Sequence, residues 1–365
     1  MQTKLSATFV PAIFSPYMTD LSKFNPDGAS NPNNNIFGLP FTEEESRLVI
    51  LPVPWEVTVS YKAGTARAPE HIKKASMQVE LLDNDCRDGW RQGIYMREPE
   101  KKLLLKSDYL RKEAELYIKF ISEGEQIGNN KFMSKALREV NAGSEEMNKW
   151  VYEQSAALIA KGKLVILLGG DHSIMLGFAK AFAEKYASFG VLQIDAHCDL
   201  REAYEGFTYS HASVMYNALK EIPQISKLVQ IGVRDYTDCE IDFIEANPSR
   251  VVTFFDKDIK EKRYENESWK SIAESIIAQL PEYVYVSFDI DGLDPKLCSH
   301  TGTPVMGGFE TEEIFYLLRK IIQSGKKIIG FDLVEVGVSH REWDENVGAR
   351  VLYKLCNLLL LSSPQ

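Results

Sequence analysis

The chain has 365 residues, of which 44% are hydrophobic and 26% are charged. This composition can fill a sizeable core, so it excludes a wholly disordered chain. The net charge of -10 argues against a general binder of nucleic acid or of anionic membranes, because both attract a basic protein face. A small cationic substrate remains compatible with such a charge.

The first part of the chain predicts few regular elements. Asn, Pro and Gly crowd residues 25–35, which predicts a loop. Residues 47–55 form a short apolar run stopped by prolines, which predicts a buried strand. Pro69 followed by Glu70 fits the first turn of a helix. Lys, Glu and Leu dominate residues 97–162, which predict two or more amphipathic helices.

From residue 163 onward, strand-like apolar segments alternate with helical segments. The strand-like segments are 163–170, 187–197, 227–235, 250–256, 283–291 and 327–336, and the helical ones are 173–186, 266–280, 311–325 and 349–361. This alternation predicts an α/β fold whose central, mostly parallel sheet is covered on both faces, giving three α/β/α layers. We expect a single domain over residues 1–365, with an N-terminal extension (1–46) and a helical insertion at about 97–150.

The cysteines and the N-terminus bear on the cellular compartment. Five widely spaced cysteines without a CxxC pair do not form a disulfide framework, which favours a reducing environment. The segment MQTKLSATFV soon meets Pro11 and Pro16, so it lacks the apolar core of a signal peptide. No apolar run approaches the length of a membrane span. We therefore expect a cytoplasmic protein without a membrane partner.

Residues that can bind a metal ion follow four of the predicted strands. The carboxyl ends of parallel strands meet at one edge of a sheet, where ligand sites form. If the chain stays extended after a strand, side chains at alternate positions point to one side. The candidates are Asp171 and His172 after the strand at 163–170, Asp195, His197 and Asp199 after GVLQI, Asp289 and Asp291 after YVYVSF, and Glu335 near the end of 327–336.

Two imidazoles and four carboxylates at one sheet edge would repel one another without a cation. The oxygen-rich set suits Mn²⁺ better than an ion that prefers thiolates. Six ligands are too many for one open catalytic zinc ion, but they suffice for two ions if some carboxylates bridge. Two ions about 3.5–4 Å apart can share a hydroxide and create a nucleophile at neutral pH.

Each motif alone has an ordinary alternative. A strand-end aspartate often caps the following helix, and a polar DxD is often only a loop. Gly169-Gly170 lacks the spacing of either common phosphate-binding loop. Cys198 alternates away from its neighbours, which predicts a packed core thiol. The occurrence of three such motifs on three strands favours a metal centre.

The motifs GGDHS (169–173), DAHCD (195–199) and SFDIDGLDP (287–295) resemble the signatures of the ureohydrolase family, which includes arginase, agmatinase and formiminoglutamase. The resemblance covers roughly residues 47–75 and 163–360. It implies two Mn²⁺ ions per subunit, with Ni²⁺, Co²⁺ or Fe²⁺ as alternatives, and a homo-oligomer, either a trimer or a hexamer. The implied ligands are His172, Asp195, Asp199 and Asp289 for one ion and Asp195, His197, Asp289 and Asp291 for the other, with Asp195 and Asp289 bridging.

The resemblance also implies a reaction. A metal-bridging hydroxide, oriented by Asp199, would attack the guanidino carbon, and the products would be urea and an amine. Glu335 would pair with the substrate guanidinium, because a planar cation with forked donors suits a carboxylate. His211, in YSHASVM, would carry the proton to the leaving amine. The alternative for His211 is a polar surface histidine in a loop.

The substrate is less determined than the reaction. The segment DLREAYEGFTYSHASVM resembles one branch of the agmatinases, and Thr237 replaces the acidic residue that meets the α-amino group of arginine in arginases. We expect agmatine, cleaved to urea and putrescine, with guanidine, a guanidino acid or formiminoglutamate as alternatives. Arg201 could meet a carboxylate. Ser299-His300 and Trp55-Glu56 depart from the family pattern; His300 fits a pocket or a loop equally, and Trp55 fits packing.

Two other classes of function are weighed against a binuclear hydrolase. A non-enzymatic relative is expected to have lost a ligand, yet all six candidates are present, together with His211 and Glu335. A single-zinc deacylase on a related fold would not need His197 and Asp291. A complete ligand set therefore favours the hydrolase.

Overall fold

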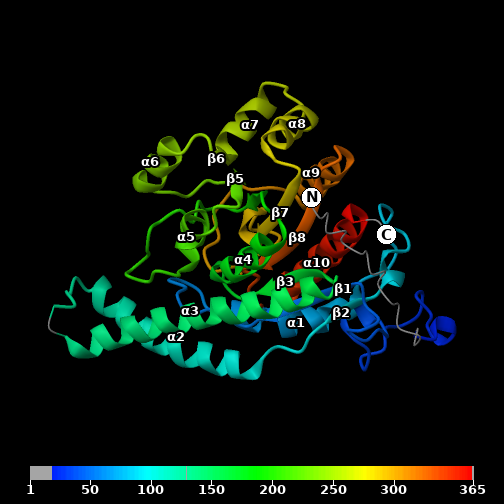
Figure 1. Cartoon of the computed structure of the whole chain (residues 1–365), viewed down its shortest axis with the longest axis horizontal. Helices are drawn as coiled ribbons and strands as arrows, with labels where there is room; N and C mark the ends of the chain where they lie inside the picture. Colours follow the sequence, from blue (N-terminus) through cyan, green and yellow to red (C-terminus); the bar gives the residue numbers. More distant parts are fainter. Residues whose placement is uncertain (1–18, 129, 364–365) are drawn as a thin grey trace, which may run out of the picture.

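An eight-stranded sheet forms the centre of the computed structural model, which describes residues 19–128 and 130–363 (Figure 1). All the strand pairs in it are parallel, and the strand order is β2-β1-β3-β8-β7-β4-β5-β6. The strands are β1 (Leu48–Val53), β2 (Ile94–Met96), β3 (Leu164–Gly169), β4 (Phe189–Ile194), β5 (Ile225–Ile231), β6 (Val251–Phe254), β7 (Tyr283–Asp289) and β8 (Lys327–Val334).

Helices cover both faces of this sheet, as the apolar character of its strands requires. The helices are α1 (Ala68–Ala75), α2 (Lys101–Ser122), α3 (Lys131–Ala160), α4 (Met175–Lys185), α5 (Val214–Glu221), α6 (Asp238–Ala246), α7 (Asp256–Tyr264), α8 (Trp269–Gln279), α9 (Thr311–Gln323) and α10 (Trp343–Ser362). Residues of α1, α7, α8, α9 and α10 share one hydrophobic core with the sheet, and residues of α2 to α6 share the other. The predicted three-layer α/β/α architecture is therefore confirmed, and the described sheet is wholly parallel.

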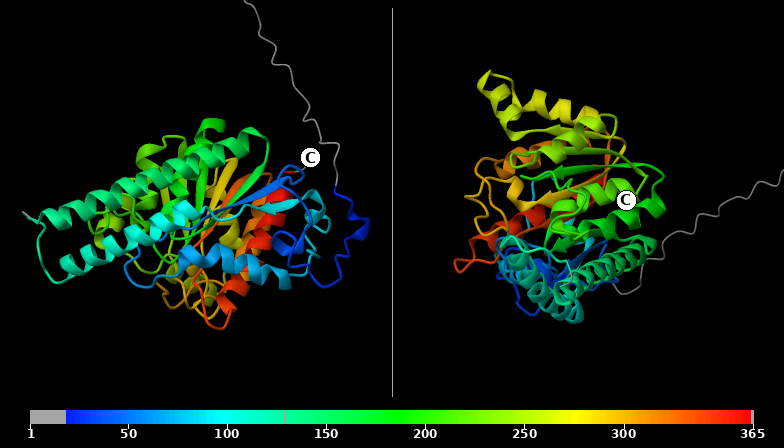
Figure 2. Two further views of the ribbon diagram at one scale, coloured as in Figure 1. Left: turned by 90° about the horizontal axis from the view of Figure 1, so that it is seen from below. Right: turned by 90° about the vertical axis from the view of Figure 1, so that its left-hand side faces the viewer.

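Helices α2 and α3 form a long hairpin that lies along one side of the molecule (Figure 2). The side chain of Asn130 caps the start of α3 by accepting hydrogen bonds from the backbone N–H groups of Phe132 and Met133. Buried residues recur along α2 at helical spacing, among them Leu103, Leu110 and Tyr117. These helices occupy the residues for which two or more amphipathic helices are predicted.

Several elements differ from the sequence prediction or lie beyond it. Strand β2 has only three residues, too few for a readable pattern, and the short helices α5, α6 and α7 are likewise unpredicted. Helix α10 begins at Trp343, six residues before the predicted start at 349. Residues 25–35 form turns, as predicted, and the Asn35 side chain hydrogen-bonds both backbone groups of Met96 on the edge strand β2. The first 18 residues of the proposed 1–46 extension lie outside the described part.

The single-domain division, with an extension and an insertion, stays a prediction. None of the helices in the described ranges is long and apolar enough to cross a membrane.

Candidate metal centre

The predicted ligand residues stand at the carboxyl ends of neighbouring central strands. His172 follows β3, Glu335 follows β8, Asp289 ends β7 and Asp195 follows β4. These four strands are adjacent in the order β3-β8-β7-β4, and all run in the same direction. The parallel topology thus brings together residues that are up to 163 positions apart in the sequence. For example, the backbone N–H of His172 donates a hydrogen bond to the Glu335 carboxylate.

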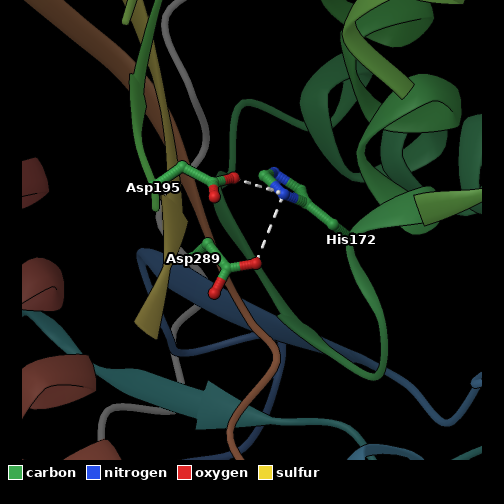
Figure 3. Close-up of side chains that lie close together, drawn as sticks. All are labelled: His172, Asp195 and Asp289. Atoms are coloured by element: carbon green, nitrogen blue, oxygen red, sulfur yellow. Dashed lines mark ion pairs between the residues drawn. The ribbon is translucent and has the colours of Figure 1, made fainter. Parts of the chain in front are cut away.

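One cluster surrounds the Nδ1 atom of His172. This nitrogen lies 3.0 Å from Oδ2 of Asp195 and 3.4 Å from Oδ2 of Asp289 (Figure 3). Oδ2 of Asp199 lies 2.9 Å from the same nitrogen. One imidazole nitrogen and three carboxylate oxygens therefore converge on one buried point.

A second cluster adjoins the first. Nδ1 of His197 lies 3.4 Å from Oδ1 of Asp195 and 3.1 Å from Oδ2 of Asp291. Asp195 thus presents one carboxylate oxygen to each histidine, which is the arrangement a bridging ligand needs. His172, Asp195 and Asp289 on one side, and Asp195, His197 and Asp291 on the other, each form a group whose ligand atoms could hold a metal ion.

The chain bends after β4, so the condition of an extended segment is not met there, although the alternate side chains still converge. Strand β4 ends at Ile194, and Asp199 has a positive φ of 54°. Asp195 accepts a hydrogen bond from the backbone N–H of His197 at 2.6 Å, and Asp289 does the same for Asp291 at 2.9 Å. These local hydrogen bonds shape the chain beyond the strand ends, where alternate side chains face the centre.

The hydrogen bonds of His172 support metal binding. Its Nε2 lies 2.8 Å from the Ser287 hydroxyl, which in turn donates to Asp332 at 3.1 Å. This chain of bonds places the imidazole proton on Nε2 and leaves a lone pair on Nδ1. Nδ1 is buried and has no well-directed hydrogen-bond partner, although three carboxylates surround it. A divalent cation fits this donor set.

The electrostatics of the cluster also call for a cation. Burial lowers the pKa of His172, but the close carboxylates of Asp195, Asp199 and Asp289 raise it more, to well above its usual value. Burial and then the charge of Asp195 raise the pKa of Asp199 to about 7. Burial and the charges of Asp291 and Asp195 raise the pKa of Asp289. Clustered buried carboxylates disfavour their own ionisation, and bound cations would reverse that effect.

Glu335 lies beside this cluster with one oxygen free. Its Oε1 accepts a hydrogen bond from the backbone N–H of His172 at 3.0 Å, while its buried Oε2 has no hydrogen-bond partner. Gly302 faces this oxygen, and a Cβ atom there would lie 3.0 Å from it. Burial, and then the charge of Asp171, raises the pKa of Glu335 well above its usual value. An incoming cation would satisfy this carboxylate.

His211 begins a short 3₁₀ turn, His211–Ser213, at the rim of the same cavity. Its Nδ1 lies 3.3 Å from the hydroxyls of both Thr58 and Ser210. Its ring meets the ring of Tyr204 edge-on at 5.9 Å. Burial, then the neighbouring His197 and His172, lower the pKa of His211 to about 3.

A cavity of about 150 Å³ connects these groups. Its outer lining includes Arg201, Tyr204, Asp235, Tyr236 and Thr237. The sequence prediction missed Tyr204, Asp235 and Tyr236 as lining residues. Tyr204 comes soon after the predicted ligand Asp199, and Asp235 and Tyr236 stand at the end of a predicted strand, so their positions could have indicated the cavity. It also missed Ser287 and Asp332, which are polar residues inside apolar strands.

The structure also places Trp55, Glu56 and His300, the residues that depart from the family pattern. Trp55 is buried, as expected for packing, and the buried Glu56 carboxylate accepts hydrogen bonds from the backbone N–H groups of Gly64 and Ala66. His300 lies 3.0 Å from Asp344 and does not line the cavity, so it is a loop residue.

Two residues of the strand-end motifs serve packing. Cys198 is fully buried, as predicted for a core thiol. A Cβ at Gly170 would lie 2.0 Å from the carbonyl oxygen of Trp55, so close packing accounts for this glycine without a phosphate ligand. Asp171 is buried and caps the turn at His172 by accepting a hydrogen bond from the backbone N–H of Ser173.

Known proteins resemble the chain over most of its length. The model of a family described as the arginase family matches residues 46–357. The N(1)-aminopropylagmatine ureohydrolase of Thermus thermophilus is 29% identical over 86% of this chain and 91% of its own length. The agmatinase of Neisseria meningitidis is 29% identical over 83% of each chain. The crystal structure of the agmatine ureohydrolase of Thermoplasma volcanium superposes with a TM-score of 0.68 and 22% identity, covering 90% of this chain and 94% of that one.

Proposed function

Because this chain belongs to the arginase family, we propose that it is an agmatinase-like ureohydrolase that cleaves a guanidino C–N bond at a centre of two divalent metal ions. Mn²⁺ is our first choice of ion, because the ligands are mainly carboxylates. The proposed ligands are those given by the family motifs: His172, Asp195, Asp199 and Asp289 on one side, and Asp195, His197, Asp289 and Asp291 on the other.

The observation that carries this proposal is the unpaired Oε2 of Glu335. This oxygen is buried without a hydrogen-bond partner, and Glu335 lines the same cavity as His172, His197 and Asp289. A buried carboxylate without a partner is costly, whereas a guanidinium offers forked donors that match it. Glu335 would therefore hold the substrate with its guanidino carbon toward the metal ligands.

The chain's own residues would support the chemistry as follows. Bound divalent ions supply a nucleophile at neutral pH by lowering the pKa of water. Glu335 orients the guanidinium, and Asp199 accepts a hydrogen bond from the attacking group. A C–O bond first forms at the guanidino carbon, which becomes tetrahedral; the C–N bond then breaks, and the leaving nitrogen needs a proton. His211 lies at the rim of the cavity and would pass that proton from solvent.

The charges around the cavity favour a substrate with a cationic or neutral tail. Arg201 is the one arginine or lysine among the described lining residues. Its guanidinium lies 4.6 Å from the centre of the Tyr204 ring and 4.0 Å from the Glu240 carboxylate. Since Arg201 already has these partners, a substrate carboxylate would have to compete for it. Agmatine, cleaved to urea and putrescine, is therefore our preferred substrate.

A longer polyamine is the second candidate. The Thermus thermophilus relative is named for aminopropylagmatine, which has an extended cationic tail. Asp235, whose side chain is 68% exposed at the mouth of the cavity, could accept a hydrogen bond from such a tail.

A urea-release screen tests the proposal. Protein loaded with Mn²⁺ or with Ni²⁺ is incubated with agmatine, aminopropylagmatine, arginine, guanidine and 4-guanidinobutyrate. Formiminoglutamate is tested in parallel by formamide release, because it has no guanidino carbon from which urea could form. We expect urea in equal amount to putrescine from agmatine, and little turnover of compounds whose tail bears a carboxylate. The absence of urea from every guanidino compound would refute the proposed reaction, and preference for 4-guanidinobutyrate would refute the argument about Arg201.

A further inference from the structure

The helical hairpin of α2 and α3 contacts both loops that flank His211. One loop, residues 54–64, follows β1 and carries Thr58. The other loop, residues 201–210, leads directly into His211. Figure 2 shows the hairpin running alongside the body of the molecule for much of its length.

One face of α2 holds the first loop at several points. The Ser107 hydroxyl accepts a hydrogen bond at 3.0 Å from the backbone N–H of Glu56, within the buried interior. One turn further along, Nη1 of Arg111 donates to the carbonyl of Val59, and the carbonyl of Val57 lies 3.4 Å from the same nitrogen. The Arg111 side chain is only 12% exposed. These bonds fix the backbone on both sides of Thr58.

Arg111 has few other partners that would explain its burial. The Glu115 carboxylate, one turn along α2, lies 3.0 Å from its Nε atom. Beyond Nε, its Nη1 atom is directed at the loop carbonyls of Val57 and Val59. The Arg111 charge also acts on Glu205 in the second loop. Burial raises the pKa of Glu205, and the charges of Arg111 and Arg201 lower it by a smaller amount.

Helix α3 holds the second loop through Asn141. Its amide Nδ2 donates to the carbonyl of Gly206 at 3.2 Å, and its Oδ1 accepts from the backbone N–H of Thr208 at 2.9 Å. A single side chain therefore satisfies two backbone groups of this loop, as a neighbouring strand would. Beside it, the Tyr117 ring of α2 packs edge-on against Phe207 at 5.3 Å.

The two loops meet at His211. The Thr58 hydroxyl lies 3.3 Å from Nδ1 of His211 and also accepts a hydrogen bond from its backbone N–H at 3.3 Å. Val59, Ser60 and Tyr61, just after Thr58, line a small recess together with His211 and Glu335. A shift in either loop would therefore move His211 relative to the Glu335 carboxylate.

We propose that Arg111 and Asn141 are positioning residues, which hold the two loops so that His211 keeps its place beside the reacting nitrogen. The identity of the reaction rests on the proposed function. The positioning rests on the hydrogen bonds from Arg111 and Asn141 to the two loops. Neither residue contacts the metal ligands or lines the cavity. The hairpin would thus be part of the catalytic apparatus rather than an independent appendage.

Arg111→Met and Asn141→Ala test this proposal, with Arg111→Lys as the conservative variant. Lys112→Ala is the matched control, because Lys112 is the next residue on α2 and is exposed. We expect kcat to fall by roughly 10- to 100-fold in Arg111→Met and Asn141→Ala, the range that follows from a small misplacement of a reacting group. KM should rise less than kcat falls, because Glu335 is untouched, and Arg111→Lys should recover part of the lost kcat.

Amide hydrogen exchange supplies a readout that needs no substrate. Exchange should become faster in peptides covering 54–64 and 201–213 in the two disruptive variants, with the central sheet unchanged and Lys112→Ala equal to wild type. Unchanged loop exchange with unchanged kcat would overturn the proposal. Faster exchange throughout the sheet together with a lower Tm would also overturn it, since that result describes a general stabilising role. Failure of the proposed reaction is scored separately, by the absence of urea from the wild-type enzyme.

Discussion

Replacing Glu335 by glutamine removes one charge at the centre of the proposed substrate site while keeping the local fold. The Oε1 atom that accepts the hydrogen bond from the backbone N–H of His172 at 3.0 Å has an equivalent in the glutamine side chain. The unpaired Oε2 becomes an amide that cannot accept from a guanidinium. A hydrogen bond to a charged group contributes about 1.5–3 kcal/mol, which corresponds to a fall in kcat/KM of about 10- to 150-fold.

The assay compares Glu335→Gln with wild type for urea release from agmatine, after the metal content of both proteins has been measured. Glu342→Gln is the matched control, because it makes the same chemical change on a side chain that is 67% exposed. We expect equal metal content in all three proteins and a lower kcat/KM only in Glu335→Gln. An unchanged kcat/KM would refute the role of Glu335, and so would a loss of activity that metal loss fully accounts for.

The other predictions concern the metal centre. His197→Asn or Asp291→Asn should reduce the metal content from two ions per chain to one and abolish most turnover, with the circular dichroism spectrum unchanged; full urea release by either variant would count against the binuclear mechanism. Asp332→Asn should weaken metal affinity about 10- to 100-fold, because Asp332 orients His172 through Ser287, and a competition titration with a chelating dye measures this. Removing metal with a chelator should lower Tm, because free ion at about 100 times its Kd stabilises the folded state by about 2.7 kcal/mol; an equal Tm with and without metal would contradict the site.

Much of the fold follows from patterns that are local in the sequence. Strands β3, β4, β7 and β8 are mainly apolar runs, and each lies within a predicted segment. Buried strands covered on both faces are predominantly apolar, so their pattern is strong. Strand β2 escaped prediction because its three residues pair only at the sheet edge with β1. The order of the strands was also beyond reach, because it depends on long-range pairing rather than on local composition.

The candidate site was predictable in its residue types but not in its geometry. Polar residues directly after apolar strands identified His172, Asp195 and Asp289, because parallel strand ends meet at one edge. The bends that aim these side chains depend on hydrogen bonds such as that from the N–H of His197 to Asp195, which no periodicity encodes. The hydrogen bonds from Arg111 and Asn141 to the two loops beside His211 come from helices whose sequence shows only ordinary amphipathic character.

Metal counting on the wild-type protein tests the central claim most directly. The protein is loaded with Mn²⁺, freed of loosely held ions by gel filtration, and its metal is measured by mass spectrometry against its concentration. The arrangement of Asp195 between His172 and His197 predicts two ions per chain. A value of one ion or none per folded chain would contradict a binuclear centre and the reaction proposed from it.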